Sequence, residues 1–295
     1  MDDTVTDQVE RQKPKAPSRL AIISPGGAFK YLNGANVEGG ARFHMHTMRG
    51  FATDHACIGA RTLAQSGEGF YMAVYPDMKS VTAAVMFIQD LEQYYLHSDA
   101  HADSLIRTFA AIFINHPIYS QEQFADEYWD FAQILHDVDC LSNPYDPTVS
   151  FDPYSADFEL SLAGRAVFTT TLNPQSPRMF RNSSFPVWVM NQTAQFQQLR
   201  DEGRFEKWKD KIRKRDALYD PSGESNPILA DHGSMSAKDQ LAGSPPEHFN
   251  FTVNDNVEKK VEAIKRLLKM AQDEGADAYI IDELIRRADV GAVPY

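Results

Sequence analysis

The segment 158–172 carries the pattern that most restricts the fold of this chain. Residues 158–162 and 166–172 are two runs rich in apolar and β-branched side chains, and a short connection containing Gly164 separates them. Two strand-like runs joined in this way, with a glycine for the turn, predict a β-hairpin. A hairpin pairs its strands antiparallel, so a sheet that contains this segment is antiparallel there.

Other segments predict strands and helices around this hairpin. Further strands are expected over 69–75 and 185–190, and helices over 121–137 and 193–219. Ser120 is the N-cap candidate of the helix over 121–137, and Gln123 completes a capping box. Residues 105–114 fit a buried strand or a buried helix equally well. Together these elements indicate an α+β fold, a mainly antiparallel sheet packed with helices, plus a C-terminal helical tail.

Composition along the chain predicts three parts. These are a disordered arm over 1–18, a compact domain over 19–245 and a helical C-terminal extension over 250–295. The polar, proline-containing run 243–248 is the expected linker before the extension. Apolar stripes in the extension, interrupted at Gly275, predict two helices. They fit either a helical hairpin docked on the main domain or an element that forms a homodimer.

Charge and composition exclude several classes of function. The chain has 29 Lys and Arg against 41 Asp and Glu, a formal net charge of −12, which disfavours nucleic acid and anionic membranes as partners. A hydrophobic content of 43 % in 295 residues is enough for a substantial core. The N-terminus lacks the apolar stretch of a secretory signal, and no apolar run is long enough to span a bilayer. We therefore expect a cytoplasmic protein.

Two histidine pairs are candidate metal ligands. His44 and His46 alternate, which would place both imidazoles on one face of a strand. His97 and His101 are four residues apart in a segment that we expect to be a solvated loop. The sequence places no third ligand beside either pair, so a nonheme metal centre is one alternative among several.

His136 and Cys57 are the candidates for a heme ligand. His136 lies near the end of the helix over 121–137, where a neutral imidazole beside apolar surface suits an iron ligand. The alternative is a histidine that interacts with the helix C-terminus. Cys57 lies in a turn before an apolar segment, where a thiolate could be a nucleophile or a heme ligand and a buried thiol is the alternative.

Arg178 and Arg181 are the candidates for binding an anion. They follow a strand-like run and two prolines, and two arginines three residues apart could hold a carboxylate or heme propionates. A solvated loop is the alternative. Glycine-rich nucleotide loops and the Gly-x-Ser-x-Gly motif of hydrolases are missing from the sequence, which disfavours kinases, nicotinamide enzymes and serine hydrolases.

Four blocks of the sequence, in order, resemble one known family. They are Cys57-Ile-Gly-Ala-Arg61, Tyr128-Trp-x3-Gln133-Ile-Leu-His-Asp-Val-Asp139, the run from Phe168 through Asn173-Pro-Gln-Ser-Pro-Arg178 to Gln195-Phe196, and Arg215-Asp216 with Asn226-Pro-Ile-Leu-Ala-Asp231-His-Gly233. These blocks cover roughly residues 50–242 and resemble the YqcI/YcgG family. Its members include heme-dependent N-hydroxylases of guanidine and amino groups that act in natural-product pathways.

The resemblance implies a noncovalent heme b and dioxygen chemistry on a small, amino-acid-like substrate. The chain differs from the family where His-Pro is replaced by Asn173-Pro174, and where Phe-Asn-Pro-His is replaced by a run that ends at Thr193. His136, or alternatively Cys57, is then the expected axial ligand, and Arg178 and Arg181 would hold the propionates or a substrate carboxylate. The replaced histidines favour an alternative, a ligand-binding or accessory member that has lost catalysis.

Overall fold

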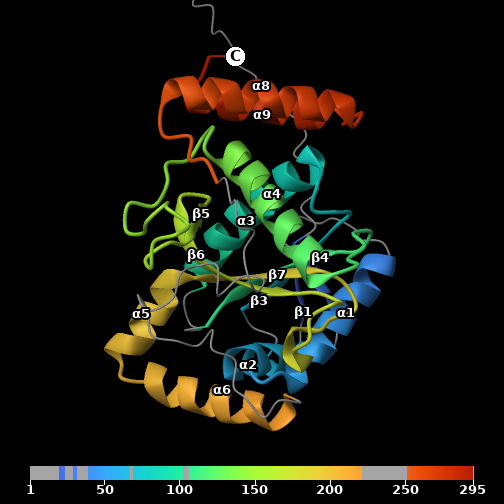
Figure 1. Cartoon of the computed structure of the whole chain (residues 1–295), viewed down its shortest axis with the longest axis vertical. Coiled ribbons are helices and arrows are strands. Elements are labelled where there is room, and N and C mark those ends of the chain that lie inside the picture. Colours follow the sequence, from blue (N-terminus) through green and yellow to red (C-terminus); the bar gives the residue numbers. More distant parts are fainter. Residues whose placement is uncertain are drawn as a thin grey trace, which may run out of the picture.

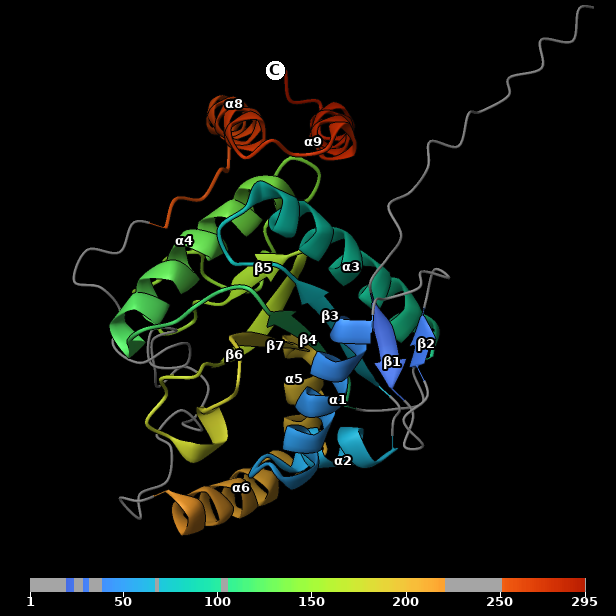
Figure 2. The ribbon, with the colours of Figure 1, turned by 90° about the vertical axis from the view of Figure 1, so that its right-hand side faces the viewer.

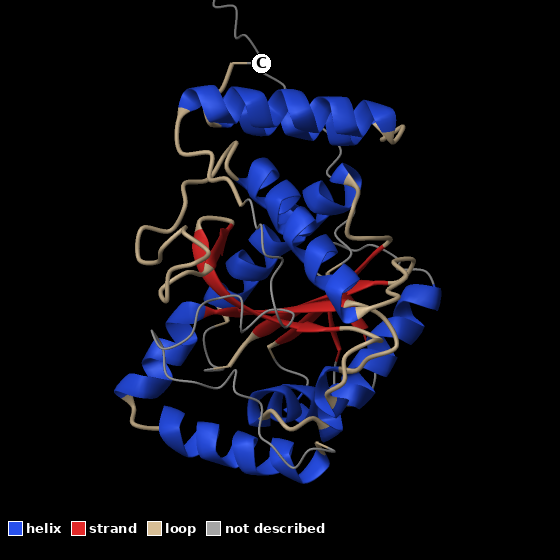
Figure 3. Ribbon diagram, viewed as in Figure 1, coloured by secondary structure: helices blue, strands red, loops and turns tan. Residues whose placement is uncertain are grey.

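The computed structural model describes residues 20–23, 29–31, 39–66, 69–101, 106–220 and 251–294. In this part of the chain a twisted sheet lies in the middle, with helices on both faces (Figure 1; Figure 3). The strands are β1 Ala21–Ile23, β2 Phe29–Tyr31, β3 Phe70–Tyr75, β4 Thr108–Phe113, β5 Leu160–Leu162, β6 Arg165–Leu172 and β7 Val187–Gln192. Their order across the sheet is β2-β1-β3-β4-β7-β6-β5, and only the β3–β4 pair of these strands is parallel. The expected α+β fold with a mainly antiparallel sheet is confirmed.

The predicted hairpin is present as β5 and β6. Leu162 pairs with Arg165, so the turn consists of Ala163 and Gly164. Both turn residues have positive φ angles, 52° and 71°, as a tight two-residue turn between twisted strands requires. Glycine adopts this conformation without steric cost, which explains why Gly164 marks the turn in the sequence.

The ambiguous segment 105–114 contains the buried strand β4. All six of its residues are buried, and it runs parallel to β3. The helix α3 Val81–Ala100 connects the two strands, which forms a β-α-β unit. A strand that is covered by helices on both faces shows no alternation of polar and apolar side chains, so its period could not separate strand from helix.

The helices form layers on the two faces of the sheet (Figure 2). One face is covered by α3 and by α4 Gln121–Asp139, which begins at the expected N-cap, since the Ser120 hydroxyl accepts a hydrogen bond from the Gln123 N–H at 3.1 Å. The other face is covered by α1 Gly39–Asp54, α2 Ile58–Ser66, α5 Thr193–Asp201 and α6 Phe205–Tyr219. The larger hydrophobic core lies on the α3–α4 side, and a second, smaller one lies under α1 and α2.

The expectation of a strand around His44 and His46 is wrong, because both residues belong to α1. Met45, Met48 and Ala52 are the buried positions of this helix, at spacings of three and four residues. Residues two apart on a helix point about 200° away from each other. The two imidazoles therefore point to different sides of α1 and cannot act as two ligands of one site.

The single helix expected over 193–219 is instead two helices, α5 and α6. The break falls at Gly203, whose φ angle is 65°. A left-handed residue ends an α-helix, and α6 begins two residues later, at Phe205.

The C-terminal extension forms α8 Val257–Asp273 and α9 Ala278–Val290, separated at Gly275 as expected. Both helices pack on the outer side of α3 and α4, so the docked hairpin is what the structure shows. The expected arm over 1–18 and linker over 243–248 lie outside the described residues. No helix in the described part of the chain is long and apolar enough to cross a membrane.

Candidate functional site

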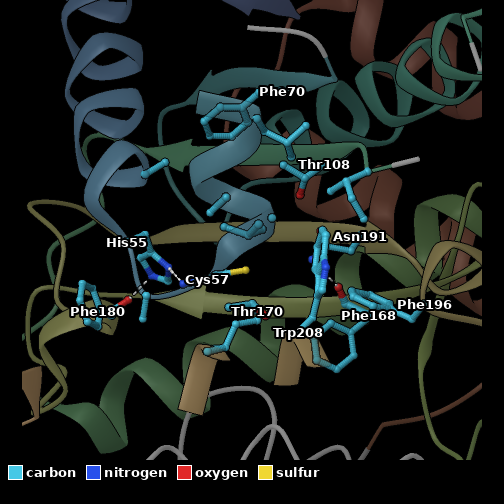
Figure 4. Close-up of a pocket in the computed structure, with 18 of the residues that line it drawn as sticks. His55, Cys57, Phe70, Thr108, Phe168, Thr170, Phe180, Asn191, Phe196 and Trp208 are labelled. Carbon is cyan, nitrogen blue, oxygen red and sulfur yellow. Dashed lines mark hydrogen bonds between the residues drawn. The ribbon is translucent and has the colours of Figure 1, made fainter. Parts of the chain in front are cut away.

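A cavity of about 180 Å³ lies between the sheet and the layer formed by α1, α2, α5 and α6. Its walls are mostly apolar, and several aromatic side chains line it (Figure 4). The small residues Gly59 and Ala60 of α2 face it, which leaves the space unfilled. Apolar walls with a few polar groups are typical of sites for small organic ligands.

Cys57 contributes its thiol to the wall of this cavity, as Figure 4 shows. The Cys57 carbonyl accepts a backbone hydrogen bond from Arg61 at 3.2 Å, which begins α2. Burial raises the pKa of the thiol, while the backbone N–H groups of Ala60 and Gly59 and the charge of Arg181 oppose this shift. The free thiol is therefore protonated at neutral pH, and a cation in the cavity would favour its thiolate form.

His55 holds the turn that presents Cys57. Its Nδ1 accepts a hydrogen bond from the Cys57 backbone N–H at 3.0 Å, so Nε2 carries the proton and donates to the Phe180 carbonyl at 2.7 Å. Burial lowers the pKa of His55 to about 4, which keeps the ring neutral. Sequence reasoning missed this residue, although its place two residues before Cys57 was the available signal.

The two candidate arginines do not act as one clamp. Arg181 lines the cavity and donates to the Thr171 carbonyl at 3.0 Å, and burial lowers its pKa to about 10. Arg178 instead pairs with Asp220 at 3.0 Å and with Asp216 at 3.5 Å, which ties the loop after β6 to α6. Of the two, only Arg181 faces the cavity.

His136 lies on the other side of the sheet, on α4, and the structure does not bring it together with Cys57. The ring is 3 % exposed, and its Nε2 accepts a hydrogen bond from the Asn254 backbone N–H at 3.0 Å. Phe251 packs against it with ring centres 5.3 Å apart. Burial lowers the pKa of His136 to about 4. The lone pair that an iron would need is therefore used to hold the C-terminal extension.

The other expected positions also lie away from the cavity. His97 is in α3 and not in a loop, its Nδ1 lies 2.7 Å from the Tyr71 hydroxyl, and its ring stacks on His101 at 4.1 Å. Asn173 donates to the Gln121 side chain at 3.0 Å, and Thr193 contacts Glu159. Among the residues that the structure describes, no three His, Cys, Asp or Glu side chains gather as a metal site.

Gln195 is one of the polar residues of the cavity that sequence reasoning did not assign. It lies in the first turn of α5 and is 8 % exposed, and its Oε1 accepts a hydrogen bond from the Arg107 backbone N–H at 3.0 Å. Its Nε2 has no hydrogen-bond partner among the described residues. A buried donor left without a partner costs about 1–3 kcal/mol unless a ligand or a water satisfies it.

The donor chemistry of the cavity fits a heme. Cys57 offers a thiol that a bound iron would deprotonate, Arg181 offers a cation for a propionate, and the walls are apolar and aromatic. The present volume of about 180 Å³ is closer to the roughly 150 Å³ cavity that holds benzene than to a porphyrin. A heme therefore requires the α5–α6 layer to move away from the sheet.

Comparison with known proteins gives one finding. The model of the YqcI/YcgG family matches residues 44–247, a span that runs from α1 past α6 and contains the described residues that line the cavity. No curated protein and no solved structure matches the chain. Both helices of the C-terminal extension lie beyond the match. Because the match covers most of the 295 residues, the chain belongs to the YqcI/YcgG family.

Proposed function

We propose that this protein is a heme-dependent oxygenase that hydroxylates a nitrogen of a small, amino-acid-like molecule in a biosynthetic pathway. The observation that carries the proposal is the Cys57 thiol on the wall of an apolar cavity within the family's span of the chain. Membership of a family that includes heme-dependent N-hydroxylases supplies the reaction class. A bound heme b would supply the activation of dioxygen, which amino-acid side chains cannot perform.

The residues of the cavity have distinct parts in this proposal. Cys57 would hold the iron as a thiolate, and His55 fixes the turn that presents it. Arg181 would bind a propionate. The aromatic walls exclude water from the reacting nitrogen. That nitrogen reacts through its lone pair, so an apolar chamber that favours the uncharged amine or guanidine assists the reaction.

Absorption spectroscopy of heme-supplemented protein tests the proposal, with Cys57→Ala and His136→Ala as paired variants. We expect a Soret band in the wild type and in His136→Ala, and a lost or shifted band in Cys57→Ala. The position of the ferrous–carbonyl band separates thiolate from imidazole ligation. Circular dichroism checks that both variants are folded.

Two outcomes would contradict it. A wild-type protein without a Soret band at stoichiometric heme would exclude the heme enzyme. A band that survives in Cys57→Ala but disappears in His136→Ala would transfer the ligand to α4, and would mean that the extension leaves His136 when heme binds.

A second candidate function is a ligand-binding member of the family that uses no heme. The small cavity volume favours it, as do Asn173 and Thr193, which stand where the family has histidines. Thermal stabilisation by a small molecule, with no heme spectrum and no oxygen consumption, is the result expected of this candidate.

A further inference from the structure

The orientation of the Gln195 amide is fixed by its surroundings. Its oxygen accepts from the Arg107 backbone N–H, and a flipped amide would place two donors against each other. The NH2 group is therefore the end without a partner among the described residues, in a residue that lines the cavity. It is also buried.

We infer that Gln195 binds an acceptor oxygen of the substrate, a carbonyl or carboxylate carried on a small apolar body. The inference rests on the proposed function, because it places the substrate in the same cavity. An acceptor at Gln195 would satisfy the amide donor. The rest of the molecule would lie against the aromatic walls, where the Phe168 and Phe196 rings contact each other with centres 5.1 Å apart (Figure 4).

The charges of the lining set the preferred charge of this substrate. Among the described lining residues, Arg181 and Lys209 are cationic and Asp216 is the carboxylate, which already pairs with Arg178. His55 is neutral, since its pKa is lowered to about 4. Lys209 is likewise paired with Glu206 at 2.7 Å, and Arg181 already donates to the Thr171 carbonyl. An incoming oxygen acceptor therefore meets the Gln195 donor and the nearby charge of Arg181, whereas among the described lining residues an ammonium group meets only Asp216, which Arg178 already neutralises.

In the heme-free protein, where α5 and α6 lie as described, the cavity volume limits the size of a probe that carries the acceptor. The cavity, about 180 Å³, is slightly larger than the roughly 150 Å³ cavity that holds benzene. It therefore has room for a benzene ring with one small substituent. We therefore choose single-ring probes of matched size: acetophenone, benzoate, ethylbenzene and benzylamine. Acetophenone and ethylbenzene differ by the carbonyl oxygen, and benzoate and benzylamine differ in the sign of the charge.

The experiment measures the dissociation constants of these probes for the heme-free full-length protein by calorimetry. We expect acetophenone and benzoate to bind about tenfold more tightly than ethylbenzene, and benzylamine to bind least well. Gln195→Glu keeps the acceptor for Arg107 but replaces the donor by a carboxylate oxygen. It should abolish the advantage of acetophenone and benzoate and improve the binding of benzylamine.

Two further variants make the result specific. Gln197→Glu adds the same charge on the exposed side of α5 and should leave the ranking of the probes unchanged. Gln195→Met removes the donor without adding charge, so it should also abolish the preference for acetophenone. It keeps the question testable if Gln195→Glu does not fold.

Two results would overturn the inference. Equal affinity of the wild type for acetophenone and ethylbenzene would mean that the Gln195 amide does not bind an acceptor oxygen. A Gln195→Glu variant with unchanged probe binding but weakened heme binding would assign the acceptor to a heme propionate. The probe measurements contain no heme, so they test the inference about Gln195 even if the protein binds no heme. Conversely, the Soret measurement tests heme binding even if the probes show no preference.

Discussion

Asp139 illustrates how one buried polar side chain can control stability. It lies at the end of α4, is 3 % exposed, and accepts hydrogen bonds from the Asn143 side chain at 2.8 Å and from the Ala163 backbone N–H at 2.9 Å. It thereby ties α4 to the β5–β6 turn. Burial raises the pKa of Asp139 to about 7, against the lowering effects of Asn143 and Arg287.

This raised pKa predicts a pH dependence of stability. Between about pH 4 and pH 7 the folded protein keeps a proton at Asp139 that the unfolded chain releases, so the free energy of unfolding falls as pH rises through this window. Asp139→Asn removes that dependence. From pH 4 to pH 8 the wild type should lose roughly 2–4 kcal/mol more than the variant, measured by urea unfolding. The exposed Asp157→Asn is the control, and parallel curves for wild type and Asp139→Asn would contradict the assignment.

The helix α9 lies on the outer side of the fold, and Arg287 attaches it to α3. This side chain is fully buried, and its guanidinium contacts both oxygens of Glu92 on α3, at 2.8 and 2.9 Å. Glu283, one turn earlier on α9, lies 2.9 Å from it. A buried cation with two carboxylate partners connects the extension to the domain at one defined position.

We expect Arg287→Met to destabilise the protein by roughly 2–4 kcal/mol, because Glu92 and Glu283 lose a buried partner. The neighbouring Arg286→Met is the matched control. Its side chain is 52 % exposed, so its loss should cost less than about 1 kcal/mol. Urea unfolding of the two variants gives the comparison, and equal costs would show that Arg287 does not fasten α9.

On the scale of the whole molecule, the extension is an integral layer of the fold. Ile264, Leu267 and Leu284 belong to the same hydrophobic core as α3, α4 and the sheet. The Glu274 carboxylate accepts hydrogen bonds from the first backbone N–H groups of α3, at 3.0 Å from Val81 and 2.9 Å from Thr82. The extension's residues in these contacts lie beyond the span of the family match, so this chain stabilises the shared domain with a layer that the family model does not include.

Deletion of residues 251–294 should therefore lower the melting temperature and expose apolar surface, although the remainder still spans the family match. Circular dichroism and the binding of a hydrophobic dye measure both effects. Addition of a separate peptide covering 249–295 should restore the melting temperature. A truncated protein that melts like the wild type would show that the extension is dispensable to the fold.

The sequence by itself determined part of the local structure. The N-cap at Ser120, the hairpin turn at Gly164 and the break at Gly275 were each predicted and are each present. The predicted capping box is incomplete, because the Gln123 side chain accepts from the Tyr119 backbone N–H at 2.8 Å. These features depend on a few neighbouring residues, whose conformational preferences and hydrogen bonds act within one turn. The family blocks likewise identified the family, since they require only residue types in order.

Only the tertiary structure decided the choice between α1 and a strand at His44, and the assembly of the cavity from helices far apart in the chain. His136 has the features of an iron ligand in the sequence, yet Asn254, more than a hundred residues later, occupies its lone pair. Gln195 has no local signal, because the lack of a partner for its amide depends on every segment around it. Burial and hydrogen-bond satisfaction are properties of the packed molecule, and packing brings together residues whose separation along the chain gives no indication of their contact.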